Sequence, residues 1–307
     1  MYRIAVLMST YNGDKYLSEQ IESILSQEKV EVVLFVRDDG SSDRTGDILE
    51  SYSGQYSNVI VERGCNIGVG NSFMELVYKI PTNGFDYYAF ADQDDIWLSQ
   101  KLINAANSIT HISGPALYVS NQTLVDQNLI KIKERYVTSP RIEYKQILCQ
   151  NKVSGCTMVW NHPLHKLLVE YKRRPSAQLL RNRIHDVWVA MVASVVGVIV
   201  YDEQSNIMYR QHENNVIGVR KTNIIKQWIN KVFNAEEQNG RSRLAREIVD
   251  RFGDCIKNED DLNILKTYGY YQEDAKTKKR LLHDRTIVKY SGEKLNMFRL
   301  KVLLNLF

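Results

Sequence analysis

The chain opens with the apolar run RIAVLMS (residues 3–9), the mixed segment DKYLSEQIESILSQ (14–27) and a second apolar run, VEVVLFV (30–36). Apolar residues recur at helical spacing in the middle segment, whereas the two flanking runs are short and almost continuously apolar. Runs of that kind are typical of strands that are buried on both faces of a parallel sheet. Residues 3–36 therefore predict a β-α-β unit.

The same alternation continues along the next part of the chain. It predicts an α/β fold, in which helices flank a mostly parallel sheet on both faces. The predicted segments are helices at 44–52, 71–79, 98–109 and 186–195, strands at 59–62, 87–91, 116–120 and 198–201, and a helix or strand pair at 156–171.

The pattern changes near residue 220. From about residue 222 glycines are rare, and charged residues alternate with apolar ones at helical spacing. We therefore predict two parts, a catalytic domain at 1–220 and a helical, basic C-terminal extension at 221–307.

The charge of the chain is concentrated at its C-terminal end. The formal net charge of +4 is small for 307 residues and gives no indication of nucleic-acid binding. Residues 276–307, however, hold nine basic residues against two acidic ones and end in the apolar run VLLNLF (302–307). A basic segment with an apolar end suits an anionic membrane surface, an acidic partner or a dimer contact. The alternative is a solvated helix that packs its apolar stripe on the main domain.

Composition argues against several classes of protein. No run approaches the roughly 20 apolar residues that are needed to cross a bilayer, and the first residues lead directly into a predicted strand rather than a signal peptide. The four cysteines are scattered without a Cys-x-x-Cys pair, so neither a thiolate zinc site nor a disulfide framework is indicated. We expect a cytoplasmic protein with free thiols.

Polar loops follow four of the predicted strands. Ligands of open parallel sheets bind beyond the carboxyl ends of the strands, so these loops are the first candidates for a site. Turn formation and helix capping are the alternative explanation for the first three, because Asp, Asn, Ser and Gly favour both. The loops are STYNG (9–13), DDGSSD (38–43), NIG (66–68) and DQDD (92–95).

The fourth loop places three carboxylates within four residues after the apolar run 87–91. Carboxylates this close repel one another unless a cation compensates them. Oxygen ligands favour Mg²⁺ or Mn²⁺ over zinc, and such sites often complete their coordination with substrate phosphate. The loop therefore predicts a divalent metal and a phosphate compound, with a solvated acidic turn as the alternative.

Three motifs, VLMSTYNG (6–13), DDGSSD (38–43) and ADQDDIW (91–97), resemble those of family 2 glycosyltransferases with the GT-A fold. Together with HDVW (185–188) and YRQHENN (209–215), they are similar to the motifs of bacterial rhamnosyltransferases of cell-wall and capsule polysaccharide synthesis. The resemblance covers roughly residues 1–220. The combination in this order is specific, whereas any one motif would be weak.

The resemblance implies a nucleotide pocket. Tyr11 would lie against the base, and Asp39 would accept a hydrogen bond from the imide N–H of uracil or thymine. Asp92 would lie by the ribose and the metal. The residues that the resemblance assigns to nucleotide binding are Thr10, Tyr11, Asp39, Asn66, Gly68, Asn71 and Asp92.

The resemblance also implies the groups that carry out the reaction. Asp94, with Asp92 and His212, would hold Mn²⁺ or Mg²⁺, although His212 could instead cap a loop. Asp186 would be the base of an inverting transfer, and a helix cap is its alternative role. Residues expected to face the sugar or the acceptor are Trp97, Gly155, His185 and Trp188.

By resemblance the favoured donor is dTDP-L-rhamnose, with UDP-glucose or another UDP-hexose next. The acceptor would be a lipid-linked or polysaccharide hydroxyl, and the basic tail would hold the enzyme at the inner face of the plasma membrane. The chain lacks the Gln-x-x-Arg-Trp motif of many processive members, which disfavours a polymerase that extrudes its product.

Other classes remain as alternatives. A nucleotidyltransferase would be expected to cradle a triphosphate with a Gly-rich, basic loop after the first strand, and residues 9–13 offer neither feature. The same loop lacks the Gly-x-Gly-x-x-Gly of dinucleotide oxidoreductases. A noncatalytic protein that binds nucleotide sugars could keep the same pocket.

Overall fold

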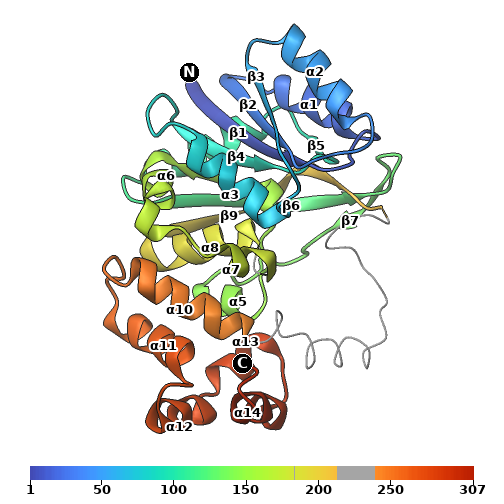
Figure 1. Ribbon diagram of the computed structural model, residues 1–307. Helices are drawn as coiled ribbons and strands as arrows, with labels where there is room; N and C mark the ends of the chain where they lie inside the picture. The colour runs from blue at the N-terminus through green and yellow to red at the C-terminus, as the bar shows by residue number, and fades with distance from the viewer. Residues whose placement is uncertain (183, 213–238) are drawn as a thin grey trace.

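A computed structural model describes residues 1–182, 184–212 and 239–307 of the chain (Figure 1). Its first part alternates strands and helices as the sequence predicts, and the four strands pair in parallel in the order β3-β2-β1-β4. These elements are β1 (Tyr2–Thr10), α1 (Leu17–Leu25), β2 (Val30–Asp38), α2 (Thr45–Gln55), β3 (Val59–Arg63), α3 (Val69–Lys79) and β4 (Tyr87–Ala91).

The second part extends the same sheet. β8 pairs antiparallel with both β4 and β6, while β6 and β9 pair in parallel, and β5 and β7 add short antiparallel edges. The prediction of a mostly parallel α/β sheet is therefore confirmed. The elements are β5 (Ile96–Trp97), α4 (Lys101–Ile109), β6 (Ala116–Val125), β7 (Lys131–Glu134), α5 (Tyr144–Cys149), β8 (Val159–Asn161), α6 (His162–Val169), α7 (Ala177–Asn182), α8 (His185–Val196) and β9 (Val198–Arg210).

Helices cover both faces of the sheet, and each face has its own hydrophobic core. On one face, α1 and α4 contribute Leu17, Ile21 and Leu102 to the core. On the other, α3, α6 and α8 contribute side chains that include Phe73 and Trp188. The strand β4 is buried at every position because it lies between β1 and β8 at the centre of the sheet.

Strand β9 is longer than the sequence indicates. The apolar signal ends at Tyr201, but the strand continues to Arg210 beside β6. Residues 202–206 are mostly polar, and the β6–β9 register shifts there, which hides the second half of the strand from periodicity. This half brings Arg210 and the residues after it to the ends of the central strands.

The C-terminal extension is helical, as predicted. Its helices are α10 (Gly240–Phe252), α11 (Glu259–Tyr270), α12 (Ala275–His283), α13 (Thr286–Ser291) and α14 (Leu295–Leu303). The boundary expected near residue 220 lies outside the described residues.

The extension packs tightly on the α/β part. Trp188 of α8 and Phe252 of α10 have ring centroids 5.9 Å apart, and both belong to one continuous core. The buried Arg173 guanidinium donates two hydrogen bonds of 2.8 Å to the Asp254 carboxylate. Because α8 lies between the sheet and α10, it is apolar on nearly every side. No helix among the described residues has the length and apolar character to traverse a bilayer.

Candidate active site

A cavity of about 960 Å³ lies beyond the carboxyl ends of β1, β2 and β4. It is where the rule for open parallel sheets places a ligand. Loops after these strands line it together with the start of α8 and the end of β9. The predicted site residues among its lining are Thr10, Tyr11, Asp39, Asn66, Gly68, Asp92, Asp94, Gly155, His185, Asp186 and His212.

One wall of the cavity carries the acidic loop after β4. Burial, together with the nearby Asp94 and Asp186 carboxylates, raises the pKa of Asp92 to about 7. Burial also raises the pKa of the fully buried Asp95 well above its usual range. Ligand atoms of Asp92, Asp95 and Cys156 all lie within 4.8 Å of one another. This wall therefore gathers negative charge that a bound cation would stabilise.

His212 reaches the acidic wall from the end of β9. Its Nε2 lies 2.7 Å from Oδ2 of Asp94, so two of the three residues expected to bind metal are in direct contact. Asp92, Asp94 and His212 all line the cavity. An imidazole and two carboxylates suit Mn²⁺ or Mg²⁺ better than the softer metals that thiolates select, so the residues present fit the expected cation.

Arg210 holds this wall together. Its backbone N–H donates to Asp95 Oδ1 at 3.2 Å, and its Nε donates to the Asp94 carbonyl at 3.0 Å. Its Nη2 donates to Glu19 Oε2 at 2.5 Å, and the side chain is almost fully buried. Sequence reasoning gave Arg210 no role, although it stands within the YRQHENN motif.

Asp186 is the second residue of α8 and faces the acidic wall across the cavity. Burial raises the pKa of Asp186 to about 6, against the lowering effects of the Val187 N–H and of Arg135. Its Oδ1 accepts from the Val187 N–H at 2.6 Å, and its Oδ2 accepts from Asn151 Nδ2 at 3.2 Å. The N-cap of α8 is Ile184, so Asp186 lies in the first turn rather than at the cap position.

His185 lies behind Asp186, with its ring stacked on Phe73 at a centroid distance of 3.9 Å. Burial lowers its pKa to about 3, so the imidazole is neutral. A Cβ on Gly155 would lie 2.7 Å from His185 Nε2, which explains why a glycine stands there. Gly155 and His185 line the cavity as expected.

The two tryptophans expected to face the sugar lie in the hydrophobic core. Trp97 is 3% exposed beneath the Lys101 ammonium, which is 3.8 Å from its ring centroid. Trp188 is fully buried against α10. Neither lines the cavity, and a sugar contact by either residue stays a prediction.

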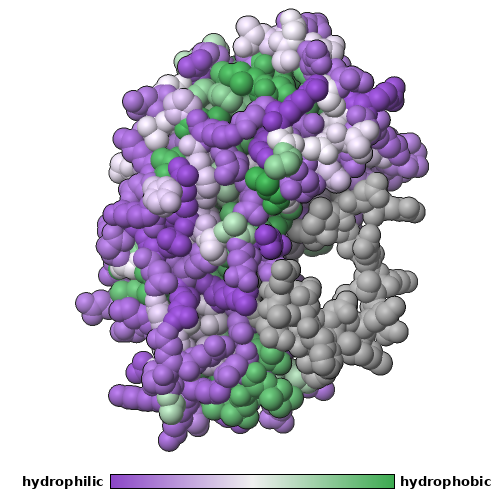
Figure 2. All heavy atoms as spheres, viewed as in Figure 1, coloured by the Kyte–Doolittle hydropathy of each residue, from purple (hydrophilic) through white to green (hydrophobic). Residues whose placement is uncertain are grey.

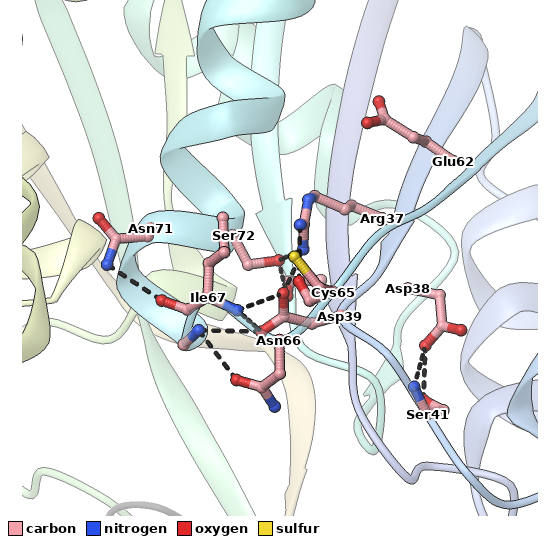
Figure 3. Close-up of polar contacts among 12 residues, drawn as sticks. Arg37, Asp38, Asp39, Ser41, Glu62, Cys65, Asn66, Ile67, Asn71 and Ser72 are labelled. Atoms are coloured by element: carbon pink, nitrogen blue, oxygen red, sulfur yellow. Dashed lines mark hydrogen bonds and ion pairs between the residues drawn. The ribbon is translucent and has the colours of Figure 1, made fainter.

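The opposite wall of the cavity is formed around Asp39 (Figure 3). Its buried carboxylate is ion-paired with Arg37 and accepts hydrogen bonds from the backbone N–H groups of Ile67 at 3.1 Å and Gly68 at 3.0 Å. A carboxylate offers about four acceptor positions, so three donors leave one for a ligand. Asp39 thereby fixes the loop that precedes α3.

Arg37 is buried beneath this loop. Besides Asp39, it donates to Ser72 Oγ and to the Cys65 carbonyl, each at 3.1 Å (Figure 3). A Cβ on Gly64 would lie 2.5 Å from Arg37 Nη2, so the chain needs a glycine to pass the guanidinium. Sequence reasoning did not identify Arg37, and its place directly before the DDGSSD motif is the only signal that sequence offered.

The remaining nucleotide-side residues have distinct positions. Thr10 is fully buried at the end of β1, whereas Tyr11 is 48% exposed at the rim. Asn66 Oδ1 accepts from the Gly68 N–H at 3.1 Å, and Gly68 has a φ of +84°, which favours glycine. Asn71 does not line the cavity, and its Nδ2 donates to the Ile67 carbonyl at 3.1 Å (Figure 3).

The chain is similar to proteins of known sequence and structure. Residues 5–168 match the family described as Glycosyl transferase family 2. A dTDP-rhamnosyl transferase, RfbG of Shigella flexneri, is 30% identical over 69% of this chain and 73% of its own length. The Escherichia coli UDP-Glc:alpha-D-GlcNAc-diphosphoundecaprenol beta-1,3-glucosyltransferase WfgD is 26% identical over 52% of this chain and 59% of its own.

The same fold occurs in a solved structure. Residues 1–349 of TarS from Staphylococcus aureus, crystallised with UDP, superpose with a TM-score of 0.60 and 16% identity. The match covers 99% of this chain and 88% of that one. At this identity the likeness shows the fold, which is of the GT-A type.

Proposed function

The chain belongs to glycosyl transferase family 2, and from this premise we propose an inverting, metal-dependent transfer of a sugar from a nucleoside diphosphate to an acceptor hydroxyl. The observation that supports the proposal best is the arrangement of the cavity. Its acidic wall, a buried carboxylate facing that wall and a hydrogen-bonding aspartate at the other end surround one space. A phosphate-binding end, a proton acceptor and a base-reading end are the parts that such a transfer requires.

Asp92, Asp94 and His212 would hold Mn²⁺ or Mg²⁺. A cation bound there compensates the negative charge that develops on the departing diphosphate, so no acid is needed to protonate it. Arg210 keeps the loop in place through the Asp94 carbonyl and the Asp95 carboxylate.

Asp186 would remove the proton of the acceptor hydroxyl. The hydroxyl oxygen forms the new bond to the anomeric carbon as the bond to the diphosphate breaks on the opposite face, and Asp186 keeps the proton. Attack from the opposite face inverts the configuration, as in inverting glycosidases. A pKa of about 6 leaves most of Asp186 ionised at neutral pH while keeping it basic enough to accept a proton.

Asp39 would recognise the nucleobase of the donor through its remaining acceptor position. Uracil and thymine both present an imide N–H, so this contact favours either over bases without a donor there. We favour dTDP-L-rhamnose because the RfbG relative is a dTDP-rhamnosyl transferase. A UDP-hexose is the second candidate, supported by the UDP-Glc-using relative and by UDP in the TarS crystal. A noncatalytic nucleotide-sugar-binding protein is the third.

The acceptor would be a lipid-linked or polysaccharide hydroxyl in bacterial cell-surface glycan synthesis. Two of the similar enzymes are named for a diphosphoundecaprenol substrate and a poly(ribitol-phosphate) substrate. The enzyme would work in the cytoplasm, at the inner face of the plasma membrane, with a homodimer as the alternative role of the basic extension.

The test is transfer from labelled dTDP-L-rhamnose and UDP-glucose in the presence of Mn²⁺. Loss of a general base costs roughly 10²–10⁴-fold, so Asp186→Asn should lower turnover by that factor while UDP or dTDP affinity stays unchanged. Asp47→Asn, on the exposed side of α2, is the matched control. If Asp186→Asn retains most of its turnover, the general base that accepts the acceptor's proton is another residue.

A further inference from the structure

A stripe of basic residues runs along α12. Lys276, Lys279, Arg280 and His283 follow one another at i, i+3, i+4 and i+7, so they share one face of the helix. All four are exposed, and within the described ranges none of them has an acidic partner within ion-pair distance. Like charges at these spacings weaken a helix, and the helix dipole favours cations only in the last turn, where Arg280 and His283 lie, so it does not account for Lys276 and Lys279.

The stripe borders a hollow of about 520 Å³ between α11 and α12. Ile264, Thr267 and Tyr268 of α11 form its other side. The one carboxylate there, Asp284, already accepts from the Tyr268 hydroxyl at 2.5 Å and from the Thr286 N–H at 2.6 Å. The hollow therefore presents cationic groups and has room for an anion.

A second stripe, on α14, is apolar and faces solvent. Leu300, Leu303 and Leu304 are 41%, 57% and 57% exposed, whereas Phe298 and Val302 on the other side of the helix are buried. Figure 2 shows an apolar area over α14, beside a hydrophilic area over α12. Packing of the tail on the main domain, the alternative named in the sequence analysis, accounts for the buried side of α14. It leaves these leucines without a partner in the described part of the chain.

The two stripes belong to one end of the molecule. Lys278 of α12 donates to the Leu303 carbonyl at 3.2 Å and to Asn305 Oδ1 at 2.8 Å, and Arg299 of α14 donates to the Leu282 carbonyl at 3.1 Å. Figure 1 places α12 and α14 at the end of the molecule that is farthest from α1 and α2.

We infer that this end is a binding surface for an anionic phospholipid bilayer, with headgroup phosphates in the α11–α12 hollow and the α14 leucines among the acyl chains near the interface. Cations and exposed leucines on two helices that pack together at the same end of the molecule match the two layers of such a surface. A second copy of the chain would bring the same cations against these, and a soluble phosphate would leave the leucines in water. The inference deepens the membrane contact proposed above but requires neither donor nor acceptor.

The test is sedimentation of the full chain with vesicles of phosphatidylcholine, with and without phosphatidylglycerol. We expect binding only to the phosphatidylglycerol vesicles, and weaker binding at higher salt. A cation near an anionic surface strengthens binding about fivefold, so the double variant Lys279→Glu/Arg280→Glu should bind at least about 25-fold more weakly. Lys133→Glu/Lys166→Glu makes the same charge change at exposed positions of β7 and α6, and should bind like the unaltered protein.

A second variant tests the apolar stripe. Leu303→Ser/Leu304→Ser should lose binding at every salt concentration, and because both side chains are exposed it should melt at the temperature of the unaltered protein. Equal binding to both kinds of vesicle, or unchanged binding of the Lys279→Glu/Arg280→Glu variant, would overturn the inference. So would a dimer in light scattering that the leucine variant dissociates. Turnover of the donor without vesicles is measured in parallel, so that failure of the proposed transfer and failure of membrane binding are told apart.

Discussion

Two walls of the same cavity carry buried aspartates, but among the described residues only Asp39 is ion-paired with a basic side chain, whereas neither Asp92 nor Asp95 is. Asp39 is paired with the buried Arg37 and with two backbone N–H groups. The acidic wall holds Asp92 and Asp95, whose carboxyls have raised pKa values because of burial and of the neighbouring carboxylates. In the proposed transfer, the base-side wall would thus be complete in the protein alone, whereas the diphosphate-side wall would be completed by a bound cation.

Because of this difference, the two walls would contribute to donor binding in different ways. A preformed ion pair fixes geometry before a ligand arrives, which favours selection of the base at little further cost in ordering. Carboxylates without an ion-pair partner would instead make donor binding depend on the metal, because the diphosphate would otherwise meet like charge. Substitutions on the two walls should therefore have different signatures.

The largest effect is expected on the acidic wall. Asp94→Asn removes a proposed metal ligand and the hydrogen-bond partner of His212, so we expect turnover to fall roughly 10²–10³-fold, as on removal of one electrostatic stabiliser of a transition state. The Mn²⁺ concentration needed for half-maximal turnover should rise as well. A variant with the Mn²⁺ requirement of the unaltered protein would show that the cation binds elsewhere.

Substitutions on the base-side wall should change the affinity for UDP and dTDP rather than the Mn²⁺ requirement of turnover. Arg37→Met leaves Asp39 buried without its partner, and the loss of a charged hydrogen bond at about 1.5–3 kcal/mol predicts roughly 10–100-fold weaker UDP and dTDP binding. Turnover at saturating donor and the Mn²⁺ requirement should change little. Calorimetry with UDP and with dTDP measures the nucleotide affinity. Turnover measured over a range of Mn²⁺ concentrations gives the Mn²⁺ requirement.

Two further variants sharpen that test. Arg37→Lys should restore part of the affinity, because it keeps the charge but loses the planar arrangement of donors. Arg63→Met removes an exposed arginine paired with Glu50 outside the cavity and should bind like the unaltered protein. If Arg37→Met binds both nucleotides normally, Asp39 does not depend on its partner for its position.

Sequence predicted the loops of both walls but missed the arginine that holds each of them, and the reason is physical. The strands from β1 to β4 and the loops at their carboxyl ends follow from apolar runs and turn residues, which are local signals. The Arg37–Asp39 pair forms only where the loop before α3 folds over β2, and Arg210 reaches Asp94 only because β9 runs through a polar stretch. Contacts of this kind depend on sheet register, which composition and spacing do not encode.

The pH dependence of turnover should reflect Asp186. Its raised pKa means that the base is protonated below about pH 6, so turnover should fall about tenfold per pH unit below that value and level off above it. A bound cation would favour the anion and lower the midpoint, whereas the donor diphosphate would raise it. Rates are measured with saturating donor, Mn²⁺ and a soluble acceptor. A rate that stays constant from pH 4 to pH 8 contradicts the assignment.

The smallest effect concerns the stability of the metal-free protein. The pKa values of Asp92 and Asp186 are raised by burial to about 7 and about 6, from a usual value near 3.8, so between pH 4 and pH 7 the folded state binds more protons than the unfolded state. The contribution of these two carboxyls to stability therefore falls as the pH rises through this window, whereas the buried His165 and His185, whose pKa values are lowered to about 4 and about 3, contribute in the opposite sense. Mn²⁺ binds the ionised carboxylates, so it should raise the melting temperature by a few degrees more at pH 8 than at pH 5. In the double variant Asp92→Asn/Asp186→Asn neither group titrates, and this difference between the two pH values should become smaller. An undiminished difference would mean that the charge compensated by the cation is on other residues, and that the contrast between the two walls is drawn in the wrong place.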